Sequence, residues 1–292
     1  MSRDAAVSSS PSPASAPAPS PDRPLSFSGW PSLSALATVL GITASRLLRG
    51  RRLWLFLLLF AAPAALVLTI RRYDNVYDAA NTEHVVVLVL FFQAVIPLSA
   101  LLFAASLIQD DVEEQTLTYF LIRPIPRWMI YAVKALGGAL VTSVLASAFA
   151  VLAMASARWG EPGHDINWLI QRAGYVAGLV SLAVLVYVAI FGCLGLVTKR
   201  ALVVGVGYIL VFEGILANIP FLLRYGTIMY HLRVLSVAWL GLDPSDWSID
   251  LADAPSPTTS LQILLGAAAL LLALGAWIFS AREFRVKTPE GN

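Results

Sequence analysis

The chain has 292 residues, of which 58% are apolar and 13% are charged, whereas an ordinary soluble domain has roughly 25% charged residues. So few charges could not cover a water-soluble core, and the apolar residues form runs long enough to cross hydrocarbon, which predicts an all-α integral membrane protein. The formal net charge of +2 provides no extended positive field, which argues against nucleic acid as a partner.

Residues 1–28 are rich in Ser, Ala and Pro, as in SSSPSPASAPAPSPDRP. They lack the continuous apolar centre of a cleavable secretory signal. We expect a disordered tail, because such a composition cannot bury enough apolar surface to offset the entropy of ordering.

The segment from residue 33 to residue 48 predicts an interfacial helix. Its apolar residues recur at helical spacing, and a basic group surrounds its end: Leu36, Val39, Leu40, Leu47; Arg46, Arg49, Arg51, Arg52. The leucines would dip into the acyl boundary while the arginines lie among anionic headgroups. A solvated helix start is the alternative.

Six apolar runs follow, each near the ~20 residues that a helix needs to cross the hydrocarbon core. They are Leu53 to Ile70, Val85 to Ile108, Met129 to Ala155, Trp168 to Val197, Ala201 to Ile219, and Leu261 to Ser280. The fourth run is longer, which indicates a tilt, a kink or a partly interfacial start at Gln171 and Arg172.

The third and fourth runs carry small residues at helical spacing: Ala135, Ala139, Ser143, Ser147; Gly174, Gly178. These stripes favour close helix packing inside one subunit, with a dimer seam as the alternative.

The distribution of Lys and Arg predicts that both termini are cytoplasmic, because basic residues near spans tend to stay on that side. The inner segments would hold Arg46, Arg49, Arg51, Arg52, Arg123, Arg127, Lys199, Arg200, Arg282, Arg285 and Lys287. The outer segments would hold fewer: Arg71, Arg72, Arg158, Arg172, Arg224 and Arg233. We therefore expect a multi-pass protein of the cell (inner) membrane.

The connection between the second and third runs, QDDVEEQTLTYFLIRPIPRW, is the most informative stretch. The carboxylates of Asp110, Asp111, Glu113 and Glu114 would each cost several kcal/mol in hydrocarbon, so the helix must emerge there into water or against a protein. The segment then becomes apolar, and its two prolines disfavour helix at Arg123 and allow a new helix to open at Pro126. The pattern predicts a short helix, a break and a re-entry that could move as a rigid lever, with a solvated connection as the alternative.

The order of these residues resembles the permeases of ABC exporters of the ABC-2 type. In that family an acidic stretch ends the second span and is followed by a Thr, an apolar helix, a Pro and a basic residue that opens the third span. The matching positions are Asp111, Glu113, Glu114, Thr116, Leu117, Leu121, Arg123, Pro124, Ile125, Pro126, Arg127 and Lys134. The resemblance implies that Asp110, Asp111, Glu113, Glu114, Thr116, Arg123, Pro124, Pro126 and Arg127 form a cytoplasmic coupling helix that contacts an ATPase.

A second similar segment is VFEGILANIPFLLRY, in which Glu213 lies within the fifth run. At a rise of about 1.5 Å per residue, Glu213 would lie roughly 18 Å from the inner boundary, where an ionised side chain needs a partner. We expect it to accept hydrogen bonds from a re-entrant outer part of this run and to brace a gate. A protonated, purely structural glutamate is the alternative.

The resemblance implies that residues 29–292 form an ABC-2 type permease domain with six transmembrane helices. It implies a second permease copy or a paralogue as partner and a separate P-loop ATPase subunit, since the sequence has no GxxxxGK[ST] motif of its own.

Catalysis within the chain is not expected, and neither is a cofactor or a metal. His84 and His164 fall in predicted outer loops, His231 falls in the outer segment 220–260, and there is no HExxH motif. We also expect no serine beside a histidine at membrane depth, as an intramembrane protease would require.

The function that these observations favour is the permease of an ATP-driven exporter. A secondary transporter would more often show several ionisable residues near the midplane, and here Glu213 stands out. A membrane scaffold without transport would share the same hydropathy.

Overall fold

A computed structural model of the chain describes residues 37–38, 40–45, 51–73, 78–113, 126–161, 165–198, 200–218, 222–247, 249 and 254–281. Within these ranges every regular element is a helix. The helices after the short one at residues 37–45 are α2 (Arg51–Tyr73), α3 (Ala79–Thr82), η1 (Glu83–Val95), α4 (Ile96–Glu113), α6 (Arg127–Arg158), α7 (Ile166–Val197), α8 (Ala201–Tyr208), η2 (Ile209–Ile215), η3 (Leu216–Asn218), η4 (Leu222–Gly226), α9 (Ile228–Leu240), η5 (Pro244–Trp247) and α10 (Pro257–Ala281).

Five helices are long and apolar enough to cross a membrane, and they coincide with five of the six predicted spans. They are Leu53–Tyr73, Ala79–Ala104, Arg127–Arg158, Ile166–Val197 and Pro257–Ala281. The second of them runs through α3, η1 and α4 without interruption and has π-helical geometry over Glu83–Val95. It begins six residues before the predicted start at Val85, so Glu83 and His84 belong to the helix and not to an outer loop.

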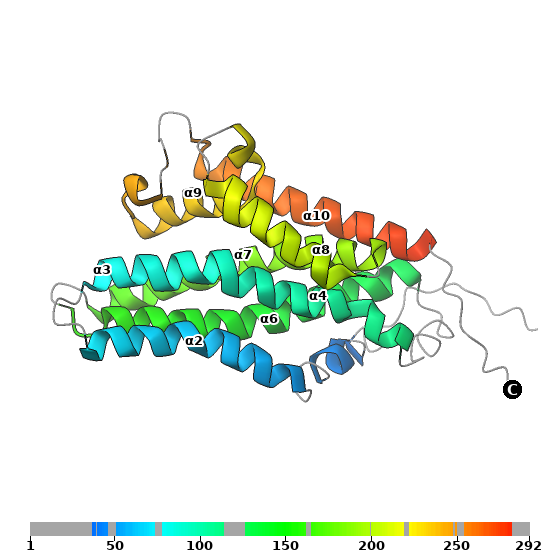
Figure 1. The fold of residues 1–292 in the computed structure, drawn as a ribbon, viewed down its shortest axis with the longest axis horizontal. Helices are drawn as coiled ribbons and strands as arrows, with labels where there is room; N and C mark the ends of the chain where they lie inside the picture. Colours follow the sequence, from blue (N-terminus) through cyan, green and yellow to red (C-terminus); the bar gives the residue numbers. More distant parts are fainter. Residues whose placement is uncertain are drawn as a thin grey trace, which may run out of the picture. The chain divides into compact units, whose positions relative to one another are not determined.

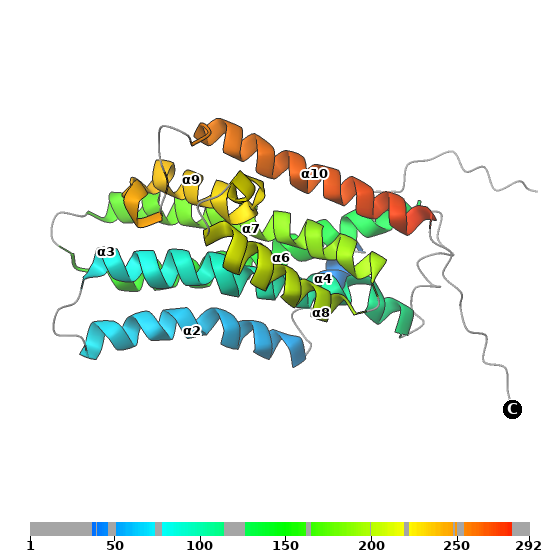
Figure 2. The ribbon, with the colours of Figure 1, turned by 45° about the horizontal axis from the view of Figure 1, so that its top comes forward.

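The predicted fifth span, from Ala201 to Ile219, is instead divided. Its apolar helix, Ala201–Ile215, is shorter than the ~20 residues of a full crossing, and a second short apolar helix follows at Ile228–Leu240. Two single turns of 3-10 helix, η3 and η4, lie between them. Figures 1 and 2 show α8 running along the bundle toward α9, which lies beside one end of α7.

Helix α7 is the centre of the bundle. It packs against α4, α6, α8, α9 and α10. Of its most apolar stretch 67% is buried, against 28% for α2 and for α10. Figures 1 and 2 show α2 and α10 on opposite sides of the α6–α7 pair, which makes them the peripheral helices.

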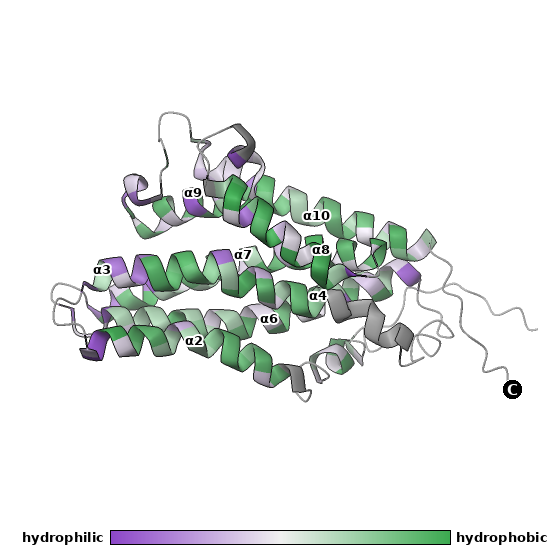
Figure 3. Ribbon diagram, viewed as in Figure 1, coloured by the Kyte–Doolittle hydropathy of each residue, from purple (hydrophilic) through white to green (hydrophobic). Residues whose placement is uncertain are grey.

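The exposed side chains fit a membrane environment. Apolar residues cover the outer faces of α2, α8 and α10 (Figure 3). We call the end of the bundle where α6 begins and α7 ends the proximal end, and the opposite end the distal end. Exposed Trp54, Trp128 and Trp277 lie toward the proximal ends of their helices, and exposed Tyr73 and Trp159 lie at distal ends. Aromatic residues at both ends are typical of the two membrane interfaces.

Small residues allow several helices to approach closely. A Cβ atom at Gly138 of α6 would lie 1.6 Å from the Phe103 ring, and one at Gly205 of α8 would lie 2.2 Å from Leu101. In the predicted stripe of the third span, Ala135 and Ala139 are buried, and Ser147 lies 3.3 Å from the Ala177 carbonyl oxygen of α7. This stripe therefore packs inside the subunit.

The glycines of the fourth span behave differently. Gly174 and Gly178 are exposed, and a Cβ at Gly174 would meet no atom within 4 Å. A Cβ at Gly178 would lie 3.8 Å from the Trp239 side chain of α9, an ordinary van der Waals contact, so neither position requires a glycine for close packing among the described residues.

The contact at Gly138 predicts a specific effect of substitution. Gly138→Ala should destabilise the purified protein by about 1–3 kcal/mol, because the methyl group would overlap a buried aromatic ring. Thermal unfolding in detergent measures this, and adding Phe103→Leu should recover part of the loss. Gly266→Ala, in α10 where a Cβ meets nothing within 4 Å, is the matched control and should be neutral or slightly stabilising. Equal unfolding temperatures for Gly138→Ala and Gly266→Ala would contradict the packing.

Candidate functional site

The predicted coupling segment lies largely outside the part of the chain that the structure describes. The side chains of Asp110, Asp111 and Glu113, and all of Glu114, Thr116, Arg123 and Pro124, are outside it. The described ends of the segment are α4, which ends at Glu113, and α6, which begins at Arg127. Pro126 precedes α6 in an extended conformation, φ −64° and ψ 139°, and thus occupies the cap position.

The helix at residues 37–45 packs against the proximal half of α6. A Cβ at Gly137 would lie 3.4 Å from Leu40 Cδ1, and Thr43 is buried. The predicted interfacial helix therefore contacts the same helix that the predicted coupling segment opens.

Glu213 lies in η2, just before the division of the fifth span, and its side chain is fully buried. One carboxylate oxygen accepts a hydrogen bond of 3.2 Å from the backbone N–H of Met229, and the other accepts one of 3.3 Å from the Tyr208 hydroxyl. Met229 is in the first turn of α9, whose side-chain cap is Thr227. The carboxylate thus satisfies a backbone donor at a helix N-terminus, where the helix dipole also favours negative charge.

Arg233, one turn further along α9, reaches back across the same division. Its Nη1 donates to the Ala217 carbonyl oxygen at 3.2 Å, and its guanidinium lies 5.4 Å from the Trp247 ring centre. The guanidinium is also an electrostatic partner of Glu213. The two short helices are therefore joined by polar contacts where the backbone of the fifth span is interrupted.

A second buried charged cluster lies near the distal end and consists of Glu83, Arg158 and Arg172. The fully buried Glu83 carboxylate accepts from Arg158 Nε at 2.6 Å and from Arg172 Nε and Nη2 at 2.6 and 3.0 Å. The second of these pairs is bidentate, which is the strongest geometry for an arginine and a carboxylate. Trp168 lies behind both guanidinium groups, at 5.8 and 4.9 Å from its ring centre. The cluster joins η1, α6 and α7.

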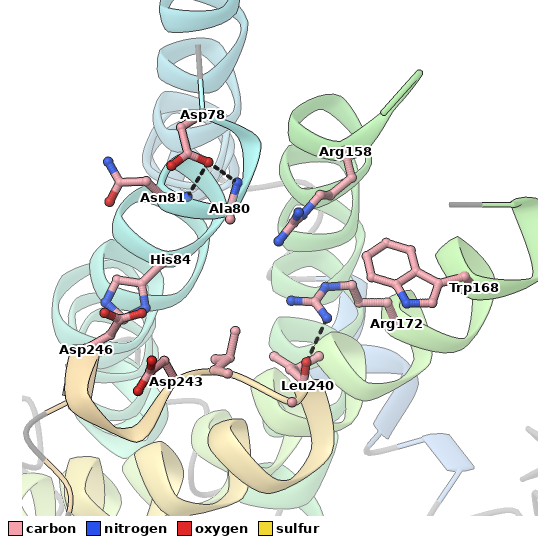
Figure 4. Close-up of a pocket in the computed structure, with 12 residues that line it drawn as sticks. Asp78, Ala80, Asn81, His84, Arg158, Trp168, Arg172, Leu240, Asp243 and Asp246 are labelled. Carbon is pink, nitrogen blue, oxygen red and sulfur yellow. Dashed lines mark hydrogen bonds between the residues drawn. The ribbon is translucent and has the colours of Figure 1, made fainter. Parts of the chain in front are cut away.

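Arg172 also binds the far end of α9. Its Nη1 donates to the Leu240 carbonyl oxygen at 2.9 Å, as Figure 4 shows. Helix α9 is consequently held by a buried carboxylate at its first turn and by a buried guanidinium at its last residue. Both charges have the sign that the helix dipole favours.

This cluster was not predicted from the sequence, because the second span was expected to begin at Val85, after Glu83, and Arg158 and Arg172 were expected among the outer basic residues. Arg172 is the seventh residue of α7, which starts at Ile166, and is 8% exposed. The available signal was an arginine inside an apolar run, since such a residue requires a buried partner.

His231 of α9 lies beside a serine of α10. His231 Nδ1 lies 3.3 Å from Ser260 Oγ, and both residues are buried in the bundle. His231 Nε2 lies 3.0 Å from the Tyr225 carbonyl oxygen, so the ring connects η4, α9 and α10. In the described residues no group of three or more His, Cys, Asp or Glu is placed to hold a metal ion.

The comparison with family models identifies the chain. Residues 37–284 match the model described as ABC-2 family transporter protein. The match extends from the interfacial helix to beyond α10. This chain belongs to the ABC-2 transporter family. It is a membrane permease of an ABC transporter, and permeases of this family generally work with an ATPase subunit. No curated protein matches the chain.

The ion cluster of this permease gives a stability prediction. Glu83→Gln should lower the unfolding free energy by about 3–5 kcal/mol, because it leaves two buried guanidinium groups without their anion. Arg158→Gln should cost less, since the bidentate pair of Glu83 with Arg172 remains. Thermal unfolding and size-exclusion profiles in detergent measure both. Glu161→Gln, a carboxylate beside the end of α6, is the control. If Glu83→Gln unfolds at the same temperature as the control, the cluster does not stabilise the bundle.

Proposed function

We propose that this permease is the membrane subunit of an ATP-driven exporter and that a separate P-loop ATPase docks at its proximal end. The observation that carries the proposal is the family match over residues 37–284, in a sequence with no phosphate-binding GxxxxGK[ST] motif of its own. In this proposal the energy is supplied by that ATPase subunit.

The docking surface in this proposal is formed by the helix at residues 37–45 and the segment 110–127. The contact of Leu40 with Gly137 supports it, because that contact brings the interfacial helix to the same end of α6 that the segment adjoins. The high basic charge of the inner segments supports a cell-membrane protein with both termini in the cytoplasm.

The proposed mechanism is mechanical. The segment 110–127 is flanked by α4 and α6, and both helices pack directly against the central helix α7. Closure of the ATPase would displace α4 and α6 as rigid bodies, and α7 would transmit the displacement to α9 and α10, with which it is also in contact.

In this account the divided fifth span is the gate. Two observations support it: the apolar helices on either side of the division are both shorter than a full crossing, and α9 is fixed through side chains of η2 and α7. Elements joined by a few polar contacts can change between discrete arrangements more readily than a continuous helix. A second copy or a paralogue of the permease would complete the pathway.

Substitution of the coupling carboxylates tests the proposal. Reversing charge with Glu113→Lys and Glu114→Lys should abolish most of the stimulation that the reconstituted permease gives to its ATPase. The reason is that the segment 110–127 would lose the negative charge with which it is proposed to contact the ATPase. ATPase rate and co-purification are measured together. Glu161→Lys at the distal end is the matched control and should leave both unchanged.

The rival classes give different results in the same experiment. A secondary transporter or a scaffold would not co-purify with an ATPase. Its transport or assembly activity would be the same in the Glu113→Lys/Glu114→Lys variant and in the Glu161→Lys control. Accessibility labelling adds the orientation: in a Cys193→Ala background, a cysteine at residue 116 should react only from the cytoplasm. Reaction from outside would overturn the proposed topology.

Substitution of Glu213 tests the gate. Glu213→Ala should destabilise the protein by about 1–3 kcal/mol and impair transport, because the buried Met229 N–H loses its acceptor. Glu213→Gln keeps an acceptor oxygen and should assemble normally, so any loss of transport in this variant reports the charge itself. Unfolding temperature and substrate-dependent ATPase activity separate the two effects. Full transport and full assembly of Glu213→Gln would show that the charge is not needed, and a normal Glu213→Ala would overturn the gate.

A further inference from the structure

A cavity of about 610 Å³ opens near the distal end and shares Arg158 and Arg172 with the ion cluster. Its volume is in the range of small-molecule sites, ~300–1,000 Å³. The charged or titratable residues among its lining are Asp78, His84, Arg158, Arg172, Asp243 and Asp246. Nothing in the proposed coupling mechanism uses this cavity.

The two sides of the cavity carry opposite charge. Figure 4 shows the Arg158 and Arg172 guanidinium groups on the side formed by α6 and α7. Asp78 and Asp246 lie on the opposite side, and Asp243 lies in the turn after α9. Among the described residues, neither arginine forms an ion pair with any of these three aspartates, so the cavity keeps the two signs apart.

The arginine side has surplus positive charge. Arg158 and Arg172 share the single carboxylate of Glu83, so one positive charge of the cluster is not neutralised by it. All three guanidinium nitrogens of Arg172 donate hydrogen bonds, Nε and Nη2 to Glu83 and Nη1 to the Leu240 carbonyl oxygen. Arg158, whose side chain is 13% exposed, donates to Glu83 through Nε and turns its guanidinium end toward the cavity (Figure 4). A bound anion on this side would meet a guanidinium fork, which suits a phosphate or a carboxylate.

The aspartate side has surplus negative charge. The Asp78 carboxylate accepts from the backbone N–H groups of Ala80 and Asn81, and Asp243 accepts from Ser245. These donors are neutral and add no positive charge, and the bonds from Ser245 hold the pKa of Asp243 below its ordinary value. Asp246 lies beside the His84 ring in Figure 4. A primary ammonium group, with three donors, suits this side.

We infer that this cavity binds a zwitterionic group, with an anion held by Arg158 and an ammonium held by Asp243 and Asp246. A ligand of one sign would meet repulsion from one of the two walls, whereas a zwitterion satisfies both. The ligand class is an amino-phosphate of the phosphoethanolamine type, which exists both as a soluble compound and as a lipid headgroup. In the proposed orientation the cavity is reached from the outer side of the membrane.

Binding of three probes to the full-length protein in detergent tests the inference by calorimetry. Phosphoethanolamine should bind at least roughly tenfold more tightly than inorganic phosphate or ethanolamine alone, because it makes both charge-assisted contacts. If either single-sign probe binds as tightly as phosphoethanolamine, or if none of the three binds, the inference is wrong.

Variants assign the two ends of the ligand. Asp246→Asn should weaken phosphoethanolamine and ethanolamine by roughly tenfold and leave phosphate unchanged, since it removes one charged acceptor. Arg158→Gln should weaken phosphoethanolamine and phosphate and leave ethanolamine unchanged. Glu161→Gln, a distal carboxylate that does not line the cavity, should change none of them. Should Arg158→Gln fail to fold, Asp246→Asn decides alone, and an unchanged affinity for phosphoethanolamine in that variant overturns the inference.

A lipid arm identifies the source of the ligand. Native mass spectrometry after reconstitution in phosphatidylethanolamine or phosphatidylglycerol should show retained phosphatidylethanolamine in the wild type and its loss in Asp246→Asn if the ligand is a headgroup. Binding of soluble phosphoethanolamine without retained lipid supports a soluble ligand of the same chemistry. These tests need no ATPase, so their outcome is independent of the proposed transport function.

Discussion

Buried charges in this protein must be paired by other groups of the protein, because hydrocarbon offers no water to solvate them. Helix α9 shows how the structure meets this constraint. Its first turn donates a backbone N–H to the buried Glu213 carboxylate, and its last residue accepts from the buried Arg172 guanidinium. A short helix that ends inside an apolar bundle would otherwise leave unsatisfied backbone groups at both ends. Its position is therefore determined by side chains of η2 and α7.

The same constraint connects α9 to the rest of the bundle. Arg172 shares Glu83 with Arg158, so η1, α6 and α7 meet at one carboxylate, and α9 is attached to that meeting point. On the proximal side α7 is in contact with α4, α6 and α8. A displacement of α6 or α7 would therefore strain polar contacts with few alternative partners. This arrangement fits the proposed mechanism, in which a displacement at the proximal end of the helices is transmitted to the distal end.

Tight packing and polar contacts have different roles along the bundle. Around Gly138 and Gly205 the helices approach closely through small residues, and an added methyl group would overlap a neighbour. Such surfaces favour movement of whole helices, because they have little room to deform. The division between η2 and α9 is instead joined by individual hydrogen bonds of the Glu213 and Arg233 side chains. Rigid helices on either side of a division that few hydrogen bonds hold together fit the proposed mechanical coupling.

The sequence by itself determined the membrane class, five apolar helices of membrane-spanning length and the family, because each depends on local composition or on residue order along a short segment. Apolar run length alone identifies Arg127–Arg158 or Pro257–Ala281 as a span, whatever its neighbours are. The partners of the buried charges were decided only by tertiary structure. Glu83 lies 75 and 89 residues from Arg158 and Arg172, and no local pattern encodes a pairing over that distance. For the same reason Arg158 and Arg172 were expected among the outer basic residues. Only the packing of α6 and α7 against η1 shows that both lie at the buried Glu83 carboxylate.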